Sequence, residues 1–213
     1  MPGPAQPGRD CALCPRLVDY RQANRAAYPD FHNAPVPSFG PLSARLLIVG
    51  LAPGLKGANR TGRPFTGDYA GDLLYATLLK CGFAAGAYGA DPGDGLELVD
   101  CRIANAVRCA PPRNQVTGPE TAACRPFLAA EMAAMAGLRA VLALGTVAHG
   151  AVLAALGQRK AHWKFAHGAR HALPNGLVLA DSYHCSRYNT NTGVLTAAMF
   201  ESVVGGLRTS LTA

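Results

Sequence analysis

Residues 45–54, RLLIVGLAPG, join a short apolar run to a glycine-rich turn. Three more apolar runs of similar length follow, separated by helix-length segments such as PETAACRPFLAAEMAAMAG and TVAHGAVLAALG. Continuous apolar runs that alternate with helical segments are typical of parallel strands covered by helices on both faces. The sequence therefore predicts an α/β fold with strands over residues 45–50, 97–106, 139–144 and 177–182.

The first forty residues differ from this alternating core. They are rich in Pro, Asn, Arg and aromatic residues, with one short helix expected over 15–27 and an extended Pro-rich stretch after it. We interpret residues 1–40 as an arm that lies on an α/β core formed by residues 41–213. No repeat or linker divides the chain, so a single domain over 1–213 is expected.

The composition narrows the classes of function. The chain has 213 residues, and 20 Lys and Arg against 13 Asp and Glu give it a net charge of +7. This excess favours a polyanionic partner, with nucleic acid as the leading class. No apolar run reaches the ~18 residues that a membrane-spanning helix needs, and the start of the chain lacks the pattern of a signal peptide. We therefore expect no membrane partner, a cytoplasmic location in the bacterial-type cytosol or nucleoid, and cysteines that are reduced or metal-bound.

Four of the seven cysteines form two groups. Cys11 and Cys14 make a C-x2-C, while Cys109 and Cys124 lie on either side of a Pro-Pro turn and a helix start. Four thiolates suit a tetrahedral metal or a cubane cluster, and the spacing alone does not separate zinc from iron–sulfur. Ordinary buried thiols are the alternative. That alternative is our interpretation of the other three, Cys81, Cys101 and Cys185.

The ends of the predicted strands are where chemistry is expected, because ligands of open α/β sheets bind beyond the carboxyl ends of the strands. After the first strand, GLAPGLKGANRTGRPFTGD (50–68) is dense in glycine but matches neither G-x-x-x-x-G-K-[ST] nor G-x-G-x-x-G. Within it, Phe65 offers a face on which a planar base can stack, with the Asp68 carboxylate nearby. The alternative interpretations are that Phe65 is an ordinary core residue and that Asp68 caps the following helix.

Two further strand ends carry polar side chains. Asn105 ends the second predicted strand, and its amide offers both a donor and an acceptor to a base edge, although an Asn that bonds its own turn is the alternative. His184 ends the fourth, and Arg187, Tyr188 and Asn189 follow it in a loop suited to phosphates. The remaining histidines of this region are interpreted as structural: His149, His162, His167 and His171.

Together and in this order, these features resemble the thermostable-type iron–sulfur uracil-DNA glycosylases, most closely their B-type branch, family five. Four features carry the resemblance, which extends from Cys11 to about Leu207: GLAPG with the following NRTGRPFTGD, Asn105 in NAVRC-PP, the cysteine spacing, and H-x-S-R-x-N-T-x-T-G at 184–193. It implies a three-layer α/β/α sandwich around a mostly parallel four-stranded sheet. It also implies a monomeric base-excision-repair enzyme that hydrolyses the N-glycosidic bond of uracil in DNA, leaves an abasic site and uses no nucleotide cofactor.

The resemblance also implies roles for single residues. Phe65 stacks on the extruded base, Asn105 reads its edge, and His184 donates to the base oxygen next to the glycosidic nitrogen. Asp68 is the candidate replacement for the acidic residue that A-type relatives have in the first motif. This chain has Leu51 and Ala52 there. The other candidates for substrate binding are Gly50, Ala52, Ser186, Arg187 and Asn189, and the candidate ligands of a [4Fe-4S] cluster are Cys11, Cys14, Cys109 and Cys124.

Two other classes of function stay open beside the excising enzyme. One is a uracil-DNA binder of the same fold that is non-catalytic or traps DNA covalently, although no His lies between Asn105 and Cys124 to act as in the trapping relatives. The other is a small-molecule nucleotide enzyme, although no P-loop Lys-Ser/Thr follows the glycines. The range of bases is equally open, since B-type relatives also remove deaminated purines such as hypoxanthine. Cys185 stands where many relatives have Pro, which leaves the shape of the DNA-inserting loop open.

Overall fold

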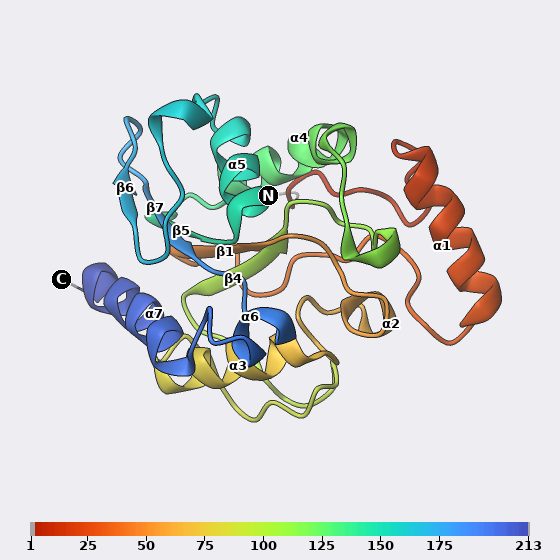
Figure 1. Ribbon diagram of the computed structural model, residues 1–213, viewed down its shortest axis with the longest axis horizontal. Coiled ribbons are helices and arrows are strands. Elements are labelled where there is room, and N and C mark those ends of the chain that lie inside the picture. The colour runs from red at the N-terminus through yellow and green to blue at the C-terminus, as the bar shows by residue number, and fades with distance from the viewer. Residues whose placement is uncertain (1–2, 213) are drawn as a thin grey trace.

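The computed structural model of the protein describes residues 3–212, and residues 1–2 and 213 of the expected domain lie outside that range. Its centre is a five-stranded sheet in the order β4-β1-β5-β7-β6 (Figure 1). The four strands expected from the sequence are β1 (Leu46–Gly50), β4 (Cys101–Asn105), β5 (Ala140–Leu144) and β7 (Val178–Ser182). They run parallel to one another, as predicted, so their carboxyl ends meet at one edge of the sheet.

Two layers of helices cover the sheet, one on each face (Figure 1). The helices are α1 (Pro15–Ala27), α2 (Ala58–Thr61), α3 (Tyr69–Lys80), α4 (Gly118–Ala134), α5 (Thr146–Ala155), α6 (Arg187–Asn191) and α7 (Ala197–Thr212), with short 3-10 turns η1 (Pro112–Asn114) and η2 (Lys160–His162). On one face, α3 and α7 pack against Leu46 and Ile48 of β1. On the other face, α4 and α5 pack against Leu47 and Val49.

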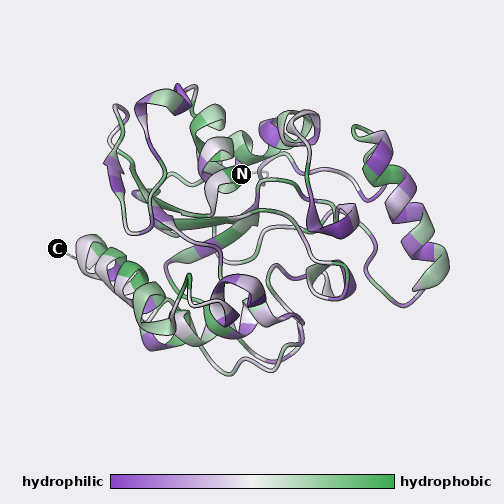
Figure 2. Cartoon of the chain, in the orientation of Figure 1, coloured by the Kyte–Doolittle hydropathy of each residue, from purple (hydrophilic) through white to green (hydrophobic). Residues whose placement is uncertain are grey.

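Burial on both faces explains why β1 and β5 are uninterrupted apolar runs. Successive side chains of a strand point to opposite faces, and here both faces are buried. These two strands are accordingly hydrophobic along their length (Figure 2). Every residue of β1 and β5 is buried, and each large aliphatic side chain among them contributes about 1.5–3 kcal/mol to the free energy of unfolding.

Two details correct the prediction of four strands. A fifth strand, β6 (Arg170–Ala172), pairs antiparallel with β7 at the sheet edge. It is three residues long and largely exposed, so it has no apolar run by which to recognise it. The strand predicted over 97–106 is broken at Asp100, whose φ of 54° lies in the left-handed region. Its first part is β3 (Glu97–Leu98), which pairs with β2 (Ala84–Ala85) in a separate two-stranded sheet.

The N-terminal segment contains the helix expected over 15–27, which starts with Pro15 at its first position. Beyond it, Phe39 bridges to Ile103 of β4, and the Val36 amide donates to the Arg108 carbonyl. The segment thereby covers the outer edge of β4, the strand at that end of the sheet. Across residues 3–212, none of the helices combines the length and the apolar character required to cross a membrane.

Candidate active site

The carboxyl ends of β1, β4 and β7 bring three of the predicted site residues together. Gly50 and Asn105 end their strands as register partners, and His184 follows β7 by two residues. Gly50 lies next to Asn105, and Asn105 and His184 line a recess of about 40 Å³, which we call the inner recess. Its lining residues are Ala52, Pro53, Gly54, Ala58, Phe65, Asp68, Ala70, Asn105 and His184.

Phe65 forms one wall of the inner recess. Its ring is buried and stacks on the His184 imidazole, with ring centroids 5.8 Å apart and an interplanar angle of 29°. Its φ of 52° lies in the left-handed region, an uncommon backbone conformation for a bulky residue that the surrounding structure must hold in place. The alternative of an ordinary core Phe holds in part, because the ring also belongs to the core under α3.

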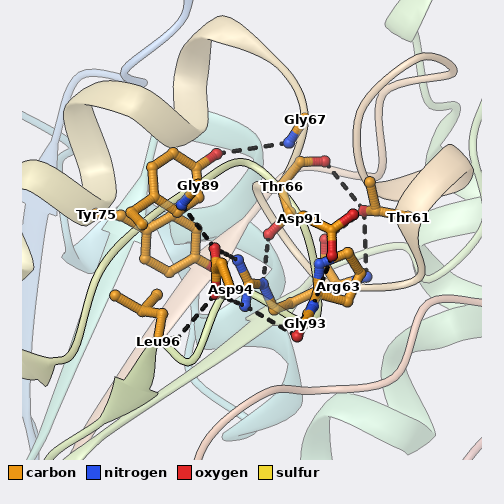
Figure 3. A network of polar contacts seen from close by, with 12 residues as sticks. Thr61, Arg63, Thr66, Gly67, Tyr75, Gly89, Asp91, Gly93, Asp94 and Leu96 are labelled. Carbon is orange, nitrogen blue, oxygen red and sulfur yellow. Dashed lines mark hydrogen bonds and ion pairs between the residues drawn. The ribbon is translucent and has the colours of Figure 1, made fainter.

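A buried ion pair holds the strained loop beside Phe65 (Figure 3). The Arg63 guanidinium binds Asp94 at 2.7 Å and also donates to the Thr66 hydroxyl at 2.8 Å. The Asp94 carboxylate in turn accepts the amides of Gly89 and Leu96. This hydrogen-bonding with Arg63 holds the pKa of Asp94 well below its usual range. Sequence reasoning missed both Arg63 and Asp94, because 31 positions separate them.

Asn105 presents a buried amide to the inner recess. The residue is 3% exposed, and its Oδ1 has no hydrogen-bond partner within the described residues. The alternative of an Asn that satisfies its own turn is therefore wrong for this oxygen. A buried amide oxygen without a partner carries a large desolvation penalty, so it is poised to accept a hydrogen bond from a ligand.

Asp68 occupies the N-cap position of α3 but makes no side-chain capping hydrogen bond. Its Oδ1 is buried without a partner, and its Oδ2 lies against the backbone of Gly54, where an added Cβ would come within 2.9 Å. A Cβ on Gly57 would overlap the same carboxylate, which explains the glycines of this loop. Burial raises the pKa of Asp68, although the backbone amides of Gly71 and Ala70 in the first turn of α3 act in the opposite direction. The carboxylate therefore faces the recess from the N-cap position of α3.

His184 is neutral near pH 7, because burial lowers its pKa to about 4. Its backbone carbonyl accepts a hydrogen bond from the Asn189 side-chain amide at 2.8 Å. Ser186 caps α6, and its hydroxyl accepts from the Asn189 backbone amide at 3.4 Å. Ser186 and Asn189 were predicted to bind substrate. In the structure their polar groups shape the loop that carries His184.

A wider cleft of about 560 Å³ adjoins the inner recess and shares five lining residues with it: Ala52, Gly54, Asp68, Ala70 and His184. We call it the outer cleft. Its lining also includes Leu51, Tyr69, Asn114, Leu144, Gly145, Thr146, Val147, Ser186 and Arg187. The Arg187 guanidinium lies over the Tyr69 ring, 5.3 Å from its centroid. Sequence reasoning singled out neither Tyr69 nor Asn114.

The four candidate cluster ligands, Cys11, Cys14, Cys109 and Cys124, line a separate small cavity between α1, α4 and the chain after β4. Each is a free thiol, and no three of the sulfur atoms lie within 4.8 Å of one another in the part of the chain that the structure describes. The Arg108 amide donates to the Cys124 sulfur at 3.3 Å. Burial raises the pKa of Cys109 to about 11, so this thiol is protonated near pH 7 unless a metal binds it. Cys81, Cys101 and Cys185 do not line this cavity, as expected.

Two of the other histidines, His149 and His171, lie apart from both recesses and form a structural network. The buried His149 contacts Asp181 through Nδ1 at 2.7 Å and the Trp163 carbonyl through Nε2 at 2.8 Å. His171 reaches the second oxygen of Asp181 at 3.0 Å. These contacts tie α5 and β6 to β7, which agrees with the structural interpretation of His149 and His171.

The fold and the site define an α/β protein with a ligand recess at the carboxyl ends of its parallel strands. The sequence profile described as "Uracil DNA glycosylase superfamily" matches residues 37–208, and the chain belongs to that family. Its similarity is highest toward type-5 members. It is 45% identical over 199 residues to a type-5 uracil-DNA glycosylase of Thermus thermophilus, covering 91% of this chain and 90% of the relative.

Two further relatives place the chain within the superfamily. A type-5 uracil-DNA glycosylase of Mycobacterium leprae is 44% identical over 203 residues, covering 91% of this chain and 88% of the relative. A type-4 uracil-DNA glycosylase of Pyrobaculum aerophilum is 32% identical over 152 residues, covering 71% and 63% respectively. The resemblance to the family-five branch is therefore confirmed.

Proposed function

We propose that this protein is a uracil-DNA glycosylase that extrudes uracil from DNA into the inner recess and hydrolyses its N-glycosidic bond, leaving an abasic site. One observation carries the proposal. Among the described residues, two buried side-chain oxygens, Asp68 Oδ1 and Asn105 Oδ1, lack partners in the same recess as the Phe65 ring and the neutral His184 imidazole. Membership of the superfamily gives this recess its substrate class.

The recess suits a flipped pyrimidine. A glycosylase cannot reach the glycosidic bond of a stacked nucleotide, so the base must leave the duplex. Phe65 offers a face for the base, and Asn105 Oδ1 accepts from an N–H on its edge, which uracil provides at N3. Gly50 keeps the floor open, because a Cβ there would lie 2.5 Å from both Asn105 Oδ1 and the Phe65 ring. An amide also donates, so Asn105 satisfies an adjacent carbonyl of the base.

His184 stabilises the departing base. As the glycosidic bond breaks, the bonding electrons pass to the base, and negative charge develops on its ring oxygens. A neutral imidazole supplies an N–H to that charge, and burial keeps the imidazole neutral near pH 7. Loss of one such donor typically costs about 2.7–4 kcal/mol of transition-state stabilisation.

Asp68 acts on the sugar. Bond cleavage leaves positive charge on C1′ of an oxocarbenium-like sugar, and an anionic carboxylate favours that state. The carboxylate also accepts a proton from the water that attacks C1′. The Oδ1 atom supports this role, because within residues 3–212 it has no hydrogen-bond partner and can accept one from water.

The outer cleft is the proposed binding surface for DNA flanking the extruded nucleotide. Arg187 lies at this cleft, and the net charge of +7 favours a polyanion.

For the domain organisation, we propose that residues 41–213 form the catalytic core. The arm, residues 1–40, supplies Cys11 and Cys14 to the cysteine cavity. The protein acts as a monomer on DNA, without a nucleotide cofactor.

We further propose that Cys11, Cys14, Cys109 and Cys124 hold a [4Fe-4S] cluster. A single tetrahedral zinc with Zn–S bonds of about 2.3 Å would bring its sulfur ligands to about 3.8 Å from one another. In the described part of the chain no three of these sulfur atoms lie within 4.8 Å of one another, and their cavity is walled by apolar side chains such as Leu17 and Phe127. The wider spacing suits a cubane, in which each cysteine binds a different iron. When bound, the cluster ties the N-terminal arm to the core.

The activity is tested on duplex DNA with a single uracil, followed by alkali to cleave abasic sites. The proposal expects strand cleavage that depends on the protein and on alkali. Hypoxanthine and xanthine duplexes, run in parallel, measure the range of bases, which the proposal extends to deaminated purines. A protein that binds uracil-DNA without yielding alkali-labile sites would contradict the enzyme and support a binder. A DNA adduct resistant to denaturation would support the covalent trap.

A further inference from the structure

Arg21 is a buried arginine without a carboxylate partner. Its side chain extends from the middle of α1, and the residue is 5% exposed. Within residues 3–212, no carboxylate oxygen comes within 4.0 Å of its guanidinium, the usual limit for an ion pair. Its Nε also has no hydrogen-bond partner there. The Asp10 carboxylate acts on Arg21 only at longer range and is itself paired with Arg25. A buried charge without a paired counter-charge is strongly destabilising, so a compensating negative charge is needed at this position.

The other buried arginines show what this chain does when it buries a guanidinium. Arg63 is paired with Asp94 at 2.7 Å (Figure 3), and Arg108 is paired with Glu131 at 2.9 Å. Both carboxylates are themselves buried. Arg21 has the same degree of burial as Arg63, yet it lacks such a partner among the described residues.

The cysteine cavity supplies the missing charge. Arg21 lines that cavity together with all four cysteines. Its Nη1 lies 3.7 Å from the Cys109 sulfur, and its Nη2 donates to the Cys11 carbonyl at 2.9 Å. One guanidinium thus reaches a cysteine of the arm and a cysteine of the core. A cubane cluster with four thiolates carries net negative charge, and hydrogen bonds to its sulfurs help set its reduction potential.

We propose that Arg21 is the counter-ion of the cluster: its guanidinium compensates the negative charge of the four thiolates and donates to the Cys109 sulfur. This inference rests on the proposed [4Fe-4S] cluster. The bare cysteine cavity leaves Arg21 unpaired, and the loaded cavity gives it an anionic partner. Arg21 is therefore a positioning and charge-compensating residue of the cluster site, remote from the bond that is cleaved.

The first measurement separates this inference from the cluster itself. Full-length wild-type protein, purified without oxygen, is assayed for iron and acid-labile sulfide, and about four of each per chain are expected. A protein without sulfide overturns the cluster proposal and the role of Arg21 with it. A loaded wild-type protein makes the Arg21 variants informative.

The loaded protein is then compared with Arg21→Gln and with Arg25→Gln as the matched control. Arg25 lies one helical turn further along α1, and its guanidinium is already paired with Asp10 at 2.7 Å. Loss of the Arg21 charge makes reduction harder, so the midpoint potential of the cluster shifts to a more negative value. With a ferrous chelator present, the visible absorption decays about tenfold faster or more, as for other groups that support metal ligands. Arg25→Gln changes neither quantity.

Arg21→Lys separates charge from shape. Lysine keeps the positive charge, so Arg21→Lys should restore the midpoint potential toward the wild-type value. It cannot reproduce the contacts of the two guanidinium nitrogens with Cys109 and Cys11. If Arg21→Gln fails to load, the iron content of the lysine and glutamine variants decides instead, and the lysine variant should retain more. The inference is overturned if Arg21→Gln keeps the wild-type potential and lifetime, or if lysine and glutamine lose iron equally. Either result would leave Arg21 as a support for the Cys11 carbonyl alone.

Discussion

Gly50 and Asn105 lie opposite each other as the last register pair of β1 and β4, and a Cβ on Gly50 would lie 2.5 Å from Asn105 Oδ1. The same Cβ would lie 2.5 Å from the Phe65 ring. Real Cβ atoms do not approach other heavy atoms so closely. The absence of a side chain at Gly50 is therefore what keeps the floor of the inner recess open for a base.

Gly50→Ala should displace Asn105, Phe65 or both. Overpacking of a well-packed site typically costs about 1–3 kcal/mol, so we expect a loss of roughly 5- to 150-fold in kcat/KM on uracil-containing DNA. The matched control is Gly118→Ala at the start of α4, where an added Cβ meets no atom within 4 Å. Steady-state kinetics of both variants measure the effect. Full activity of Gly50→Ala would show that the base does not lie against Asn105 and Phe65.

Arg187→Ala should change the salt dependence of DNA binding. If the protein neutralises about three to five phosphates, the logarithm of the binding constant falls against the logarithm of salt with a slope of about 3–5 in magnitude. Removal of one phosphate contact should reduce that slope by about 0.9. Arg159→Ala, an exposed arginine outside the cleft lining, is the control. An unchanged slope would mean that Arg187 acts only by stacking on Tyr69.

His184 should make the protein less stable as the pH falls. Its pKa is about 4 in the folded protein, against about 6.5 for a solvent-exposed imidazole, so the unfolded chain binds more protons between these values. The free energy of unfolding should therefore decrease as the pH is lowered from about 6.5 to about 4, by about 3 kcal/mol at 1.36 kcal/mol per pKa unit. Denaturant titrations across this range measure the loss.

His184→Gln should remove that part of the pH dependence, because glutamine does not titrate. His162→Gln, at an exposed position, should leave it unchanged. The assignment of His184 as a buried neutral imidazole fails if the wild-type protein and His184→Gln lose stability equally between pH 6.5 and pH 4.

Features encoded along the strands were predictable from the sequence. The four parallel strands follow from their apolar runs, and Gly50, Asn105 and His184 meet because parallel strands end at the same edge. Contacts between distant segments were not predictable. The role of Asp94 depends on a loop that returns to Arg63, and the unpaired state of Arg21 becomes visible only when the surrounding carboxylates are located. Short exposed elements such as β6 lack the apolar pattern that reveals a strand.

The role of Asp68 likewise could not be predicted from the sequence alone. Its position before a helix is typical of a capping residue, and the structure adds that one carboxylate oxygen, Oδ1, is buried without a partner among the described residues. Burial raises its pKa above 3.8, so the rate of base excision should fall as the pH is lowered through that raised pKa. Because burial raises the pKa of Asp68, the ionised carboxylate also destabilises the folded protein near pH 7. Asp68→Asn should accordingly be at least as stable as the wild type at pH 7.

The most direct test is the single-turnover rate of Asp68→Asn on a duplex with one uracil, beside the wild type at pH 7. The amide keeps the shape of the side chain but neither favours the oxocarbenium sugar nor accepts a proton from water. The account predicts a fall of about 100-fold or more, equivalent to about 2.7 kcal/mol, with DNA affinity unchanged or tighter. A folded Asp68→Asn protein that excises uracil at nearly the wild-type rate would contradict it.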